Sequence, residues 1–238
     1  WRCTWTSFLH HELGVFDVGD REEARFAMTR VEFFEKWSEL HGGAVIKGIV
    51  KWWLSISYAI SRPLIFIPPS LVTSSALVFA ALYLYWVPAP ISILYLVLTL
   101  VVDGIDGTVA LLSGKVSKNG AILDAFIDRI VEAAWAYGLI LMGASWKLVA
   151  VGWLAAFVQE YMRARAAGLG QSEVGIVTIA ERPVRATVIF IALVACAVGI
   201  ADQHVIATVA AAIWSVMQVM ALVTLFLSLR SRLTQSQR

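Results

Sequence analysis

Residues 103–129 read DGIDGTVALLSGKVSKNGAILDAFIDR, and this stretch joins two long apolar segments of the chain. It carries four aspartates where long apolar segments end and begin. Asp103 and Asp106 are three residues apart, and Asp124 and Asp128 are four residues apart, so each pair lies on one face of a helix. The short connection between the pairs predicts two antiparallel helices whose aspartates converge.

The chain around this stretch is unusually apolar. Of its 238 residues, 59% are hydrophobic, and the mean hydropathy is +0.76. A bilayer core about 30 Å thick requires about 20 apolar residues per helix, and six such runs follow residue 69. We expect an all-α membrane protein with six transmembrane helices and no nucleic-acid partner. The six runs are 70–87, 91–112, 121–142, 146–161, 184–200 and 205–229.

Basic residues indicate the orientation of these helices. The three predicted outer loops contain a single lysine, whereas basic residues gather on the opposite side. By the positive-inside rule, both termini and the aspartates lie on the cytoplasmic face of the cytoplasmic membrane. The basic residues of that face are Lys115, Lys118, Arg163, Arg165, Arg182, Arg185, Arg230, Arg232 and Arg238.

The amino-terminal part of the chain is more polar. Residues 21–40 place apolar side chains among charges in a helical rhythm, which predicts a helix packed on the cytoplasmic face. Residues 47–66 combine lysines with tryptophans and are interrupted by Pro63, as in an amphipathic helix lying in the headgroup layer. The simplest division is a cytoplasmic segment over 1–48 and a membrane domain over 49–238.

The aspartates need a compensating charge. Each aspartate within a bilayer costs about 2.5 to 3.5 kcal/mol, and neighbouring carboxylates repel. Protonation or divalent cations would relieve this cost, and an all-oxygen ligand set favours Mg²⁺ or Mn²⁺. Two such ions about 3.5 to 4 Å apart are typical of phosphoryl-transfer sites. The aspartates therefore predict a metal site that holds a diphosphate.

Two glycines accompany the aspartates. Gly104 and Gly107 lie in a helical pattern, where glycine costs about 1 kcal/mol relative to alanine. Close packing of helices is one explanation. Beside the aspartates, close approach of a ligand is the interpretation we favour.

The whole pattern resembles a family signature. D-G-x-D-G-x2-A-L-x8-G-x3-D-x3-D is similar to the D-x2-D-G-x2-A-R-x8/9-G-x3-D-x3-D signature of the CDP-alcohol phosphatidyltransferases, with seven of eight fixed residues present. Leu111 stands where the family has arginine. Residues 68–73, PPSLVT, are similar to the family's Pro-Asn-x-Val-Thr run, with Ser70 in place of asparagine. The resemblance implies a six-helix homodimeric membrane enzyme that transfers a phosphatidyl group from a CDP-linked donor to an alcohol and releases CMP.

The resemblance also implies residue roles. Asp103, Asp106, Asp124 and Asp128 would bind two Mg²⁺ or Mn²⁺ ions, and Asp128 would also be the general base. Lys115 or Lys118 would substitute for the missing arginine. The implied binding site for the CDP donor comprises Gly107, Ala110, Ser117, Gly120, Pro69 and Thr73.

Arginines on the cytoplasmic side indicate the acceptor. Several guanidinium groups near a diphosphate site suit an acceptor that itself carries phosphate. We expect this phosphate to bind to Arg129, Arg163, Arg182 and Arg185. The alternative is that they serve topology and bind anionic lipid headgroups.

Two runs narrow the choice of acceptor. EYMRARAAG and ERPVR resemble runs of bacterial phosphatidylinositol-phosphate synthases, which implies CDP-diacylglycerol as donor and L-myo-inositol-1-phosphate as acceptor. Glycerol-3-phosphate is the alternative acceptor. A cation-binding transporter is the alternative of another class, but the sequence shows no inverted repeat, and its acids cluster at one membrane face.

Overall fold

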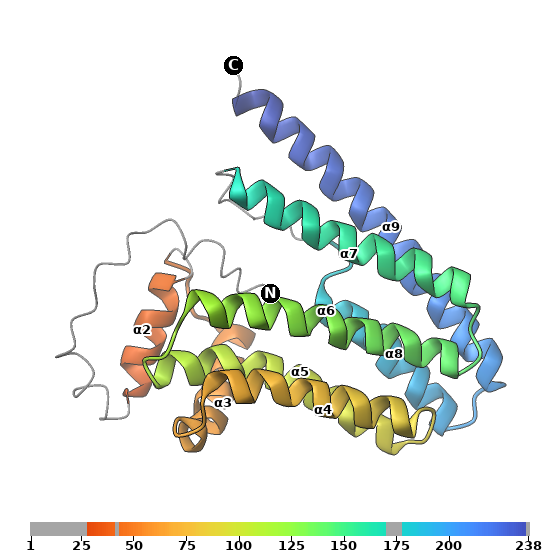
Figure 1. The fold of residues 1–238 in the computed structure, drawn as a ribbon, viewed down its shortest axis with the longest axis horizontal. Coiled ribbons are helices and arrows are strands. Elements are labelled where there is room, and N and C mark those ends of the chain that lie inside the picture. The colour runs from red at the N-terminus through yellow and green to blue at the C-terminus, as the bar shows by residue number, and fades with distance from the viewer. Residues whose placement is uncertain (1–27, 41–42, 170–177, 237–238) are drawn as a thin grey trace. The chain divides into compact units, whose positions relative to one another are not determined.

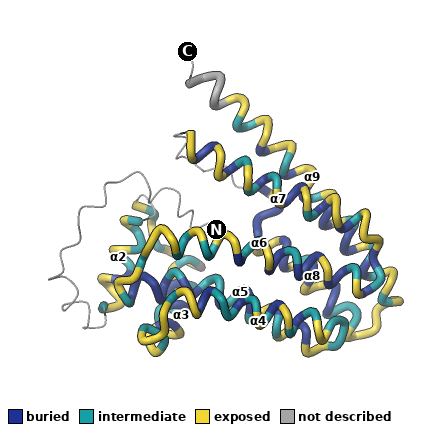
Figure 2. The backbone as a smooth tube through the Cα atoms, viewed as in Figure 1, coloured by how far each residue is buried: buried dark blue, intermediate teal, exposed yellow. Residues whose placement is uncertain are grey.

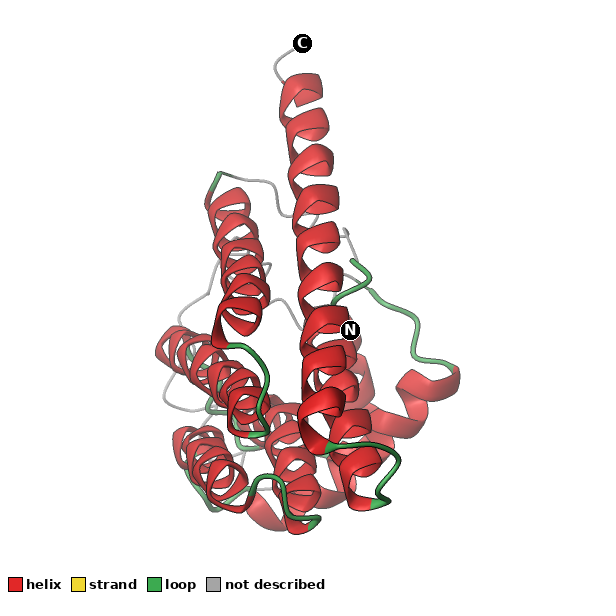
Figure 3. Ribbon diagram, turned by 90° about the vertical axis from the view of Figure 1, so that its right-hand side faces the viewer, coloured by secondary structure: helices red, strands yellow, loops and turns green. Residues whose placement is uncertain are grey.

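The computed structural model describes residues 28–40, 43–169 and 178–236. Within them the chain forms eight α-helices and one short 3-10 helix, with no strand (Figures 1 and 3). The helices are α2 (Arg30–Leu40), α3 (Gly48–Ser61), η2 (Arg62–Leu64), α4 (Pro69–Trp86), α5 (Ile91–Leu112), α6 (Lys118–Leu141), α7 (Trp146–Gly168), α8 (Arg182–Ala197) and α9 (Gln203–Ser236). The predicted all-α class is confirmed.

Each of the six predicted apolar runs coincides with one helix, from α4 to α9. Among the described residues, three helical segments are long and apolar enough to cross a membrane: Pro69–Trp86, Ile91–Leu112 and Gln203–Ser231. The first half of α6 and the second half of α7 carry several charged side chains, and α8 has only 16 residues. Six membrane crossings therefore stay a prediction, whereas the six helices are confirmed.

The contacts divide the chain into two compact units. The motif unit comprises Arg2–Ala76 and Leu100–Asp128, and the carboxyl-terminal unit comprises Leu77–Thr99 and Arg129–Arg238. The boundaries of the units run through α4, α5 and α6. The division at residue 48 that the composition suggests stays a prediction, and residues 1–27 of that segment lie outside the described residues.

Helix α2 begins with a reciprocal cap. The backbone N–H of Thr29 donates to Glu32 Oε2 at 2.6 Å, and the N–H of Glu32 lies 3.4 Å from Thr29 Oγ1. Hydrogen bonds from Thr29, the backbone one first, lower the pKa of Glu32 below its usual value. The apolar face of α2 buries Phe33 in a cluster with Leu54, Leu111 and Leu112. The predicted amphipathic helix is thus present over Arg30–Leu40.

Helix α3 packs against the end of α5 within the motif unit. Ser57 Oγ lies 2.7 Å from Thr108 Oγ1, and Ser61 Oγ donates to the carbonyl of Ile105 at 3.3 Å. A Cβ atom on Gly104 would collide with the Trp53 ring. Gly104 therefore permits close helix packing, and approach of a ligand to this glycine stays a prediction. Placement of α3 in the headgroup layer stays a prediction.

The turn between α5 and α6 explains why the aspartate pairs meet. Gly114 has φ 64°, which favours glycine. The N–H of Lys115 donates to the carbonyl of Ala110 at 2.9 Å and that of Gly114 to Leu111 at 3.2 Å, a Schellman motif that ends α5. Ser117 then caps α6, since its Oγ accepts from the N–H of Gly120 at 3.0 Å. Only residues 113–117 separate the two helices.

In the carboxyl-terminal unit, α9 packs against α7 and also contacts α8 (Figure 1). Gly152 of α7 lies against α9, because a Cβ there would come within 2.6 Å of Ser215 Oγ. Many residues of α9 nevertheless remain exposed (Figure 2), and large apolar residues are among them. They include Val205, Val209, Val216, Met220, Val223, Phe226 and Leu227. Such a surface suits a lipid environment.

Candidate active site

Three of the four motif aspartates form a cluster. One carboxylate oxygen from each of Asp103, Asp124 and Asp128 lies within 4.8 Å of the others, and all three residues are half-buried. Asp103 comes from α5, whereas the other two come from successive turns of α6. The predicted convergence of the two pairs is therefore confirmed for these three residues.

Asp106 has different surroundings. Its side chain is buried, with 6% of the residue exposed. Thr73 Oγ1 of α4 donates to Asp106 Oδ2 at 2.8 Å, and the N–H of Gly107 donates to Oδ1 at 2.6 Å. Because a carboxylate oxygen can accept two hydrogen bonds, each oxygen retains capacity for a further ligand. The structure thus joins Asp106 to α4 and leaves it outside the three-aspartate cluster.

The chemistry of the cluster fits a divalent cation. Ionised carboxylates offer only hard oxygen donors, which Mg²⁺ and Mn²⁺ prefer. Three of them within 4.8 Å repel one another unless a cation or protons compensate. Asp103, Asp124 and Asp128 would therefore hold the ion. A second ion and ligation by Asp106 stay predictions.

The six residues predicted to bind the CDP donor all belong to the motif unit. Pro69 opens α4, and Thr73 holds Asp106 one turn later. Gly107 and Ala110 lie on α5 after the first pair, while Ser117 and Gly120 form the amino-terminal cap of α6. They lie near the start of α4, the end of α5 and the start of α6, and their contact with a donor stays a prediction.

At position 111, where the family has arginine, this chain has a buried leucine. It is 6% exposed and belongs to the apolar cluster that holds Phe33 of α2. Lys115 and Lys118 are exposed on either side of Ser117. Substitution of either lysine for the missing arginine stays a prediction.

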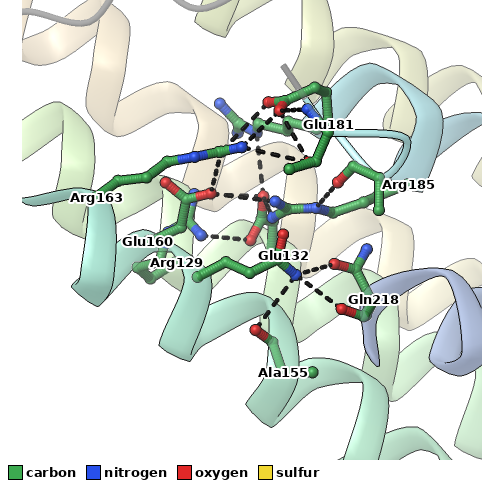
Figure 4. A network of polar contacts seen from close by, with 12 residues as sticks. Arg129, Glu132, Ala155, Glu160, Arg163, Glu181, Arg185 and Gln218 are labelled. Atoms are coloured by element: carbon green, nitrogen blue, oxygen red, sulfur yellow. Dashed lines mark hydrogen bonds and ion pairs between the residues drawn. The ribbon is translucent and has the colours of Figure 1, made fainter. Parts of the chain in front are cut away.

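The four selected arginines meet in the carboxyl-terminal unit, around glutamates that sequence reasoning missed (Figure 4). Glu132 of α6 accepts from Arg185 Nη1 at 2.7 Å and pairs with Arg129 Nη1 at 2.8 Å. Arg182 Nε lies 3.9 Å from the same carboxylate. Arg165, in contrast, is exposed.

The network continues toward α7. Arg185 Nη2 pairs with Glu160 Oε1 at 3.1 Å, and its Nε donates to the carbonyl of Ala180 at 2.7 Å. Arg163 pairs with the same Glu160 oxygen at 3.2 Å and with Glu181 Oε1 at 2.6 Å. The buried arginines are therefore held in place by protein carboxylates.

The missed glutamates had a recognisable signal in the sequence. Glu132 follows Asp128 by four residues, which continues the acidic face of α6 by one more turn. Glu160 precedes Arg163 by three residues, a spacing at which opposite charges pair on a helix. Four arginines and three glutamates leave one net positive charge, so the glutamates offset most of the positive charge of the cluster.

Comparison with known proteins agrees with the motif. The family model of the CDP-alcohol phosphatidyltransferases matches residues 66–228. An archaetidylinositol phosphate synthase of Pyrococcus horikoshii is 40% identical over 93 residues, which are 38% of this chain and 48% of the relative. One of Aeropyrum pernix is 33% identical over 79 residues, 33% of this chain and 41% of the relative.

The matches with these curated relatives span about half of their length or less. Both relatives are archaeal, whereas the sequence runs had suggested bacterial synthases. The family and the apolar helices together indicate a membrane protein. Because the family model matches most of the chain and includes all four aspartates, this protein belongs to the CDP-alcohol phosphatidyltransferase family.

Proposed function

We propose that this chain transfers a phosphatidyl group from CDP-diacylglycerol to L-myo-inositol-1-phosphate and releases CMP. The observation that carries the proposal is the convergence of Asp103, Asp124 and Asp128 within the family motif. The printed names of the two relatives support an inositol-phosphate acceptor. Because these names contain an archaetidyl group, a CDP-linked archaetidyl lipid is a second donor to test beside CDP-diacylglycerol.

The aspartates have separate tasks in this proposal. Asp103, Asp106, Asp124 and Asp128 would hold two Mg²⁺ or Mn²⁺ ions, which would supply positive charge to the diphosphate and the leaving CMP. Asp128 accepts the proton of the attacking acceptor hydroxyl. The acceptor oxygen bonds to the phosphorus that carries the lipid, and the bond from this phosphorus to the oxygen of CMP breaks.

Donor and acceptor are bound by different parts of the chain. Gly107, Ala110, Ser117, Gly120, Pro69 and Thr73 contact the CDP donor. The acceptor phosphate binds to Arg129, Arg163, Arg182 and Arg185, because guanidinium groups form paired, charge-assisted hydrogen bonds with phosphate oxygens. The adjacency of Asp128 and Arg129 on α6 supports the link between the general base and the acceptor.

Membrane placement follows from the charges. The six helices α4–α9 cross the cytoplasmic membrane, with both termini, residues 1–48 and the site on the cytoplasmic side, where basic loop residues gather. The enzyme works as a homodimer, as the resemblance implies.

The test is an acceptor screen on the purified protein with Mg²⁺ or Mn²⁺ and either CDP lipid. CMP release is measured with inositol phosphate, glycerol-3-phosphate, inositol and serine. We expect release that depends on inositol phosphate and on the metal. Preference for glycerol-3-phosphate or for an unphosphorylated alcohol would refute the acceptor, and absence of CMP release with every acceptor would refute the activity.

A further inference from the structure

Glu132 is the most deeply buried acid of the arginine network. It is 2% exposed and lies in the middle of α6. Burying a carboxylate is unfavourable unless positive groups and hydrogen-bond donors surround it. The donors that surround Glu132 come from its own helix and from α8, so it connects the two helices (Figure 4).

The two carboxylate oxygens of Glu132 contact different arginine nitrogens. Oε1 accepts from Arg185 Nη1 at 2.7 Å, and Arg182 Nε lies 3.9 Å away. Oε2 pairs with Arg129 Nη1 at 2.8 Å, while Arg129 Nη2 also reaches Oε1 at 3.3 Å. Arg129 is thus held to Glu132 by an ion pair through Nη1 and by one hydrogen bond through Nη2. One carboxylate therefore touches three of the four arginines selected for the acceptor.

Trp135, almost one turn further along α6, completes the arrangement. The Arg182 guanidinium carbon lies 5.4 Å from the centre of the Trp135 ring, within the range of a cation–π contact. The ring is itself held, because Trp135 Nε1 donates to Thr99 Oγ1 at 3.2 Å. Arg182 is thus placed by a 3.9 Å ion pair with Glu132 and by the aromatic face of Trp135.

We infer that Glu132 is a positioning residue that determines acceptor affinity by orienting Arg129, Arg182 and Arg185. This inference rests on the proposed function. Arginine side chains are long and lose rotamer freedom when they bind a ligand, so an arginine that is already oriented binds phosphate at a lower entropic cost. Glu132 also offsets part of the positive charge, which reduces the binding of unrelated anions.

The decisive variant is Glu132→Gln, which keeps the size of the side chain and removes its charge. Its amide would present N–H donors to guanidinium N–H groups, so the arginines lose their orientation. We expect the KM for inositol phosphate to rise about tenfold or more, while kcat and the KM for the CDP lipid stay within about twofold. Calorimetry should show a matching loss of inositol phosphate affinity.

Two further variants separate positioning from folding. Glu132→Asp retains the charge on a shorter side chain, and we expect an intermediate acceptor KM. If Glu132→Gln does not fold, this variant still tests the inference. Glu35→Gln removes a charge from the exposed surface of α2 and should match the wild type. Melting temperatures in detergent report the stability of each variant.

The outcomes distinguish the inference from the proposed function. If the wild type uses inositol phosphate and the KM is unchanged in both Glu132 variants, the positioning role is refuted while the function stands. If kcat and both KM values worsen together with a lowered melting temperature, Glu132 is merely structural and the inference is again refuted. If the wild type prefers an unphosphorylated alcohol, the acceptor assignment falls and the inference falls with it.

Discussion

The four aspartates of the motif have unequal surroundings although they form two similar pairs in sequence. Asp106 is buried and accepts hydrogen bonds from Thr73 and Gly107, whereas Asp103, Asp124 and Asp128 face one another. Repulsion among three converging carboxylates is the physical reason to expect a cation there. At the scale of single residues, the site therefore depends on a cation that offsets the negative charges of Asp103, Asp124 and Asp128.

The first prediction concerns the metal. Asp103→Asn and Asp124→Asn each remove one charge from the cluster without changing its shape, so both should lower CMP release about a hundredfold or more. Isothermal titration with Mn²⁺ should show weakened binding, and treating the wild type with a chelator should stop turnover. Near-normal activity in both variants and after chelation would contradict the metal site. Glu39→Gln, an exposed acid of α2, is the matched control.

The second prediction concerns the base. Asp128→Asn should lower kcat about a hundredfold or more, because general-base catalysis contributes that much and an amide cannot accept the proton. Donor affinity should fall far less, since Asp103 and Asp124 remain. Single-turnover rates and donor titrations measure the two effects separately. Equal losses in both would instead assign Asp128 to binding.

At the scale of elements, α2 and α5 depend on each other. The carboxyl end of α5 carries Leu111 at the position where the family motif has arginine, and this leucine contacts the cluster that buries Phe33. An apolar side chain is required there because α2 removes the position from water. The apolar cluster at α2 therefore accommodates the departure from the family pattern at Leu111.

The third prediction tests this dependence. Phe33→Ala should lower the free energy of unfolding by about 3 to 5 kcal/mol, because it leaves a cavity in the cluster. Leu111→Arg should cost about as much, since it places an unpaired charge among apolar side chains. Denaturation in detergent measures both changes. Val31→Ala, on the exposed face of the same helix, should cost less than about 0.5 kcal/mol, and a wild-type-like Leu111→Arg protein would show that the cluster does not exclude charge.

At the scale of the whole molecule, the surface composition determines where the protein resides. Large apolar side chains remain exposed on many helices, including α9, and exposure of this extent is unfavourable in water. Apart from Glu132 and Lys147, the charged residues of α6 and α7 lie in the halves of these helices that carry Asp128 and Arg163. A membrane would surround the apolar side chains with lipid and leave the charged halves of α6 and α7 in contact with water.

The fourth prediction tests the orientation. In a background with Cys3 and Cys196 replaced by alanine, Ala201→Cys should react with a membrane-impermeant maleimide in intact cells. Lys115→Cys should react only after the membrane is permeabilised, because the positive-inside rule places it in the cytoplasm. Both positions are exposed, so access depends on the membrane side alone. The reverse labelling pattern would invert the proposed topology.

The sequence by itself determined the helices and the meeting of the aspartates. Apolar runs, the periodicity of 3.6 residues and the turn at 113–117 are local properties, and they suffice to bring Asp103 beside Asp124 and Asp128. Tertiary structure alone decided that Trp53 fills the space at Gly104, that Leu111 lies under α2, and that Glu132 pairs with Arg185. Most of these contacts join residues far apart in the chain, and the free energy of a charge depends on the groups that surround it after burial, which no local pattern specifies.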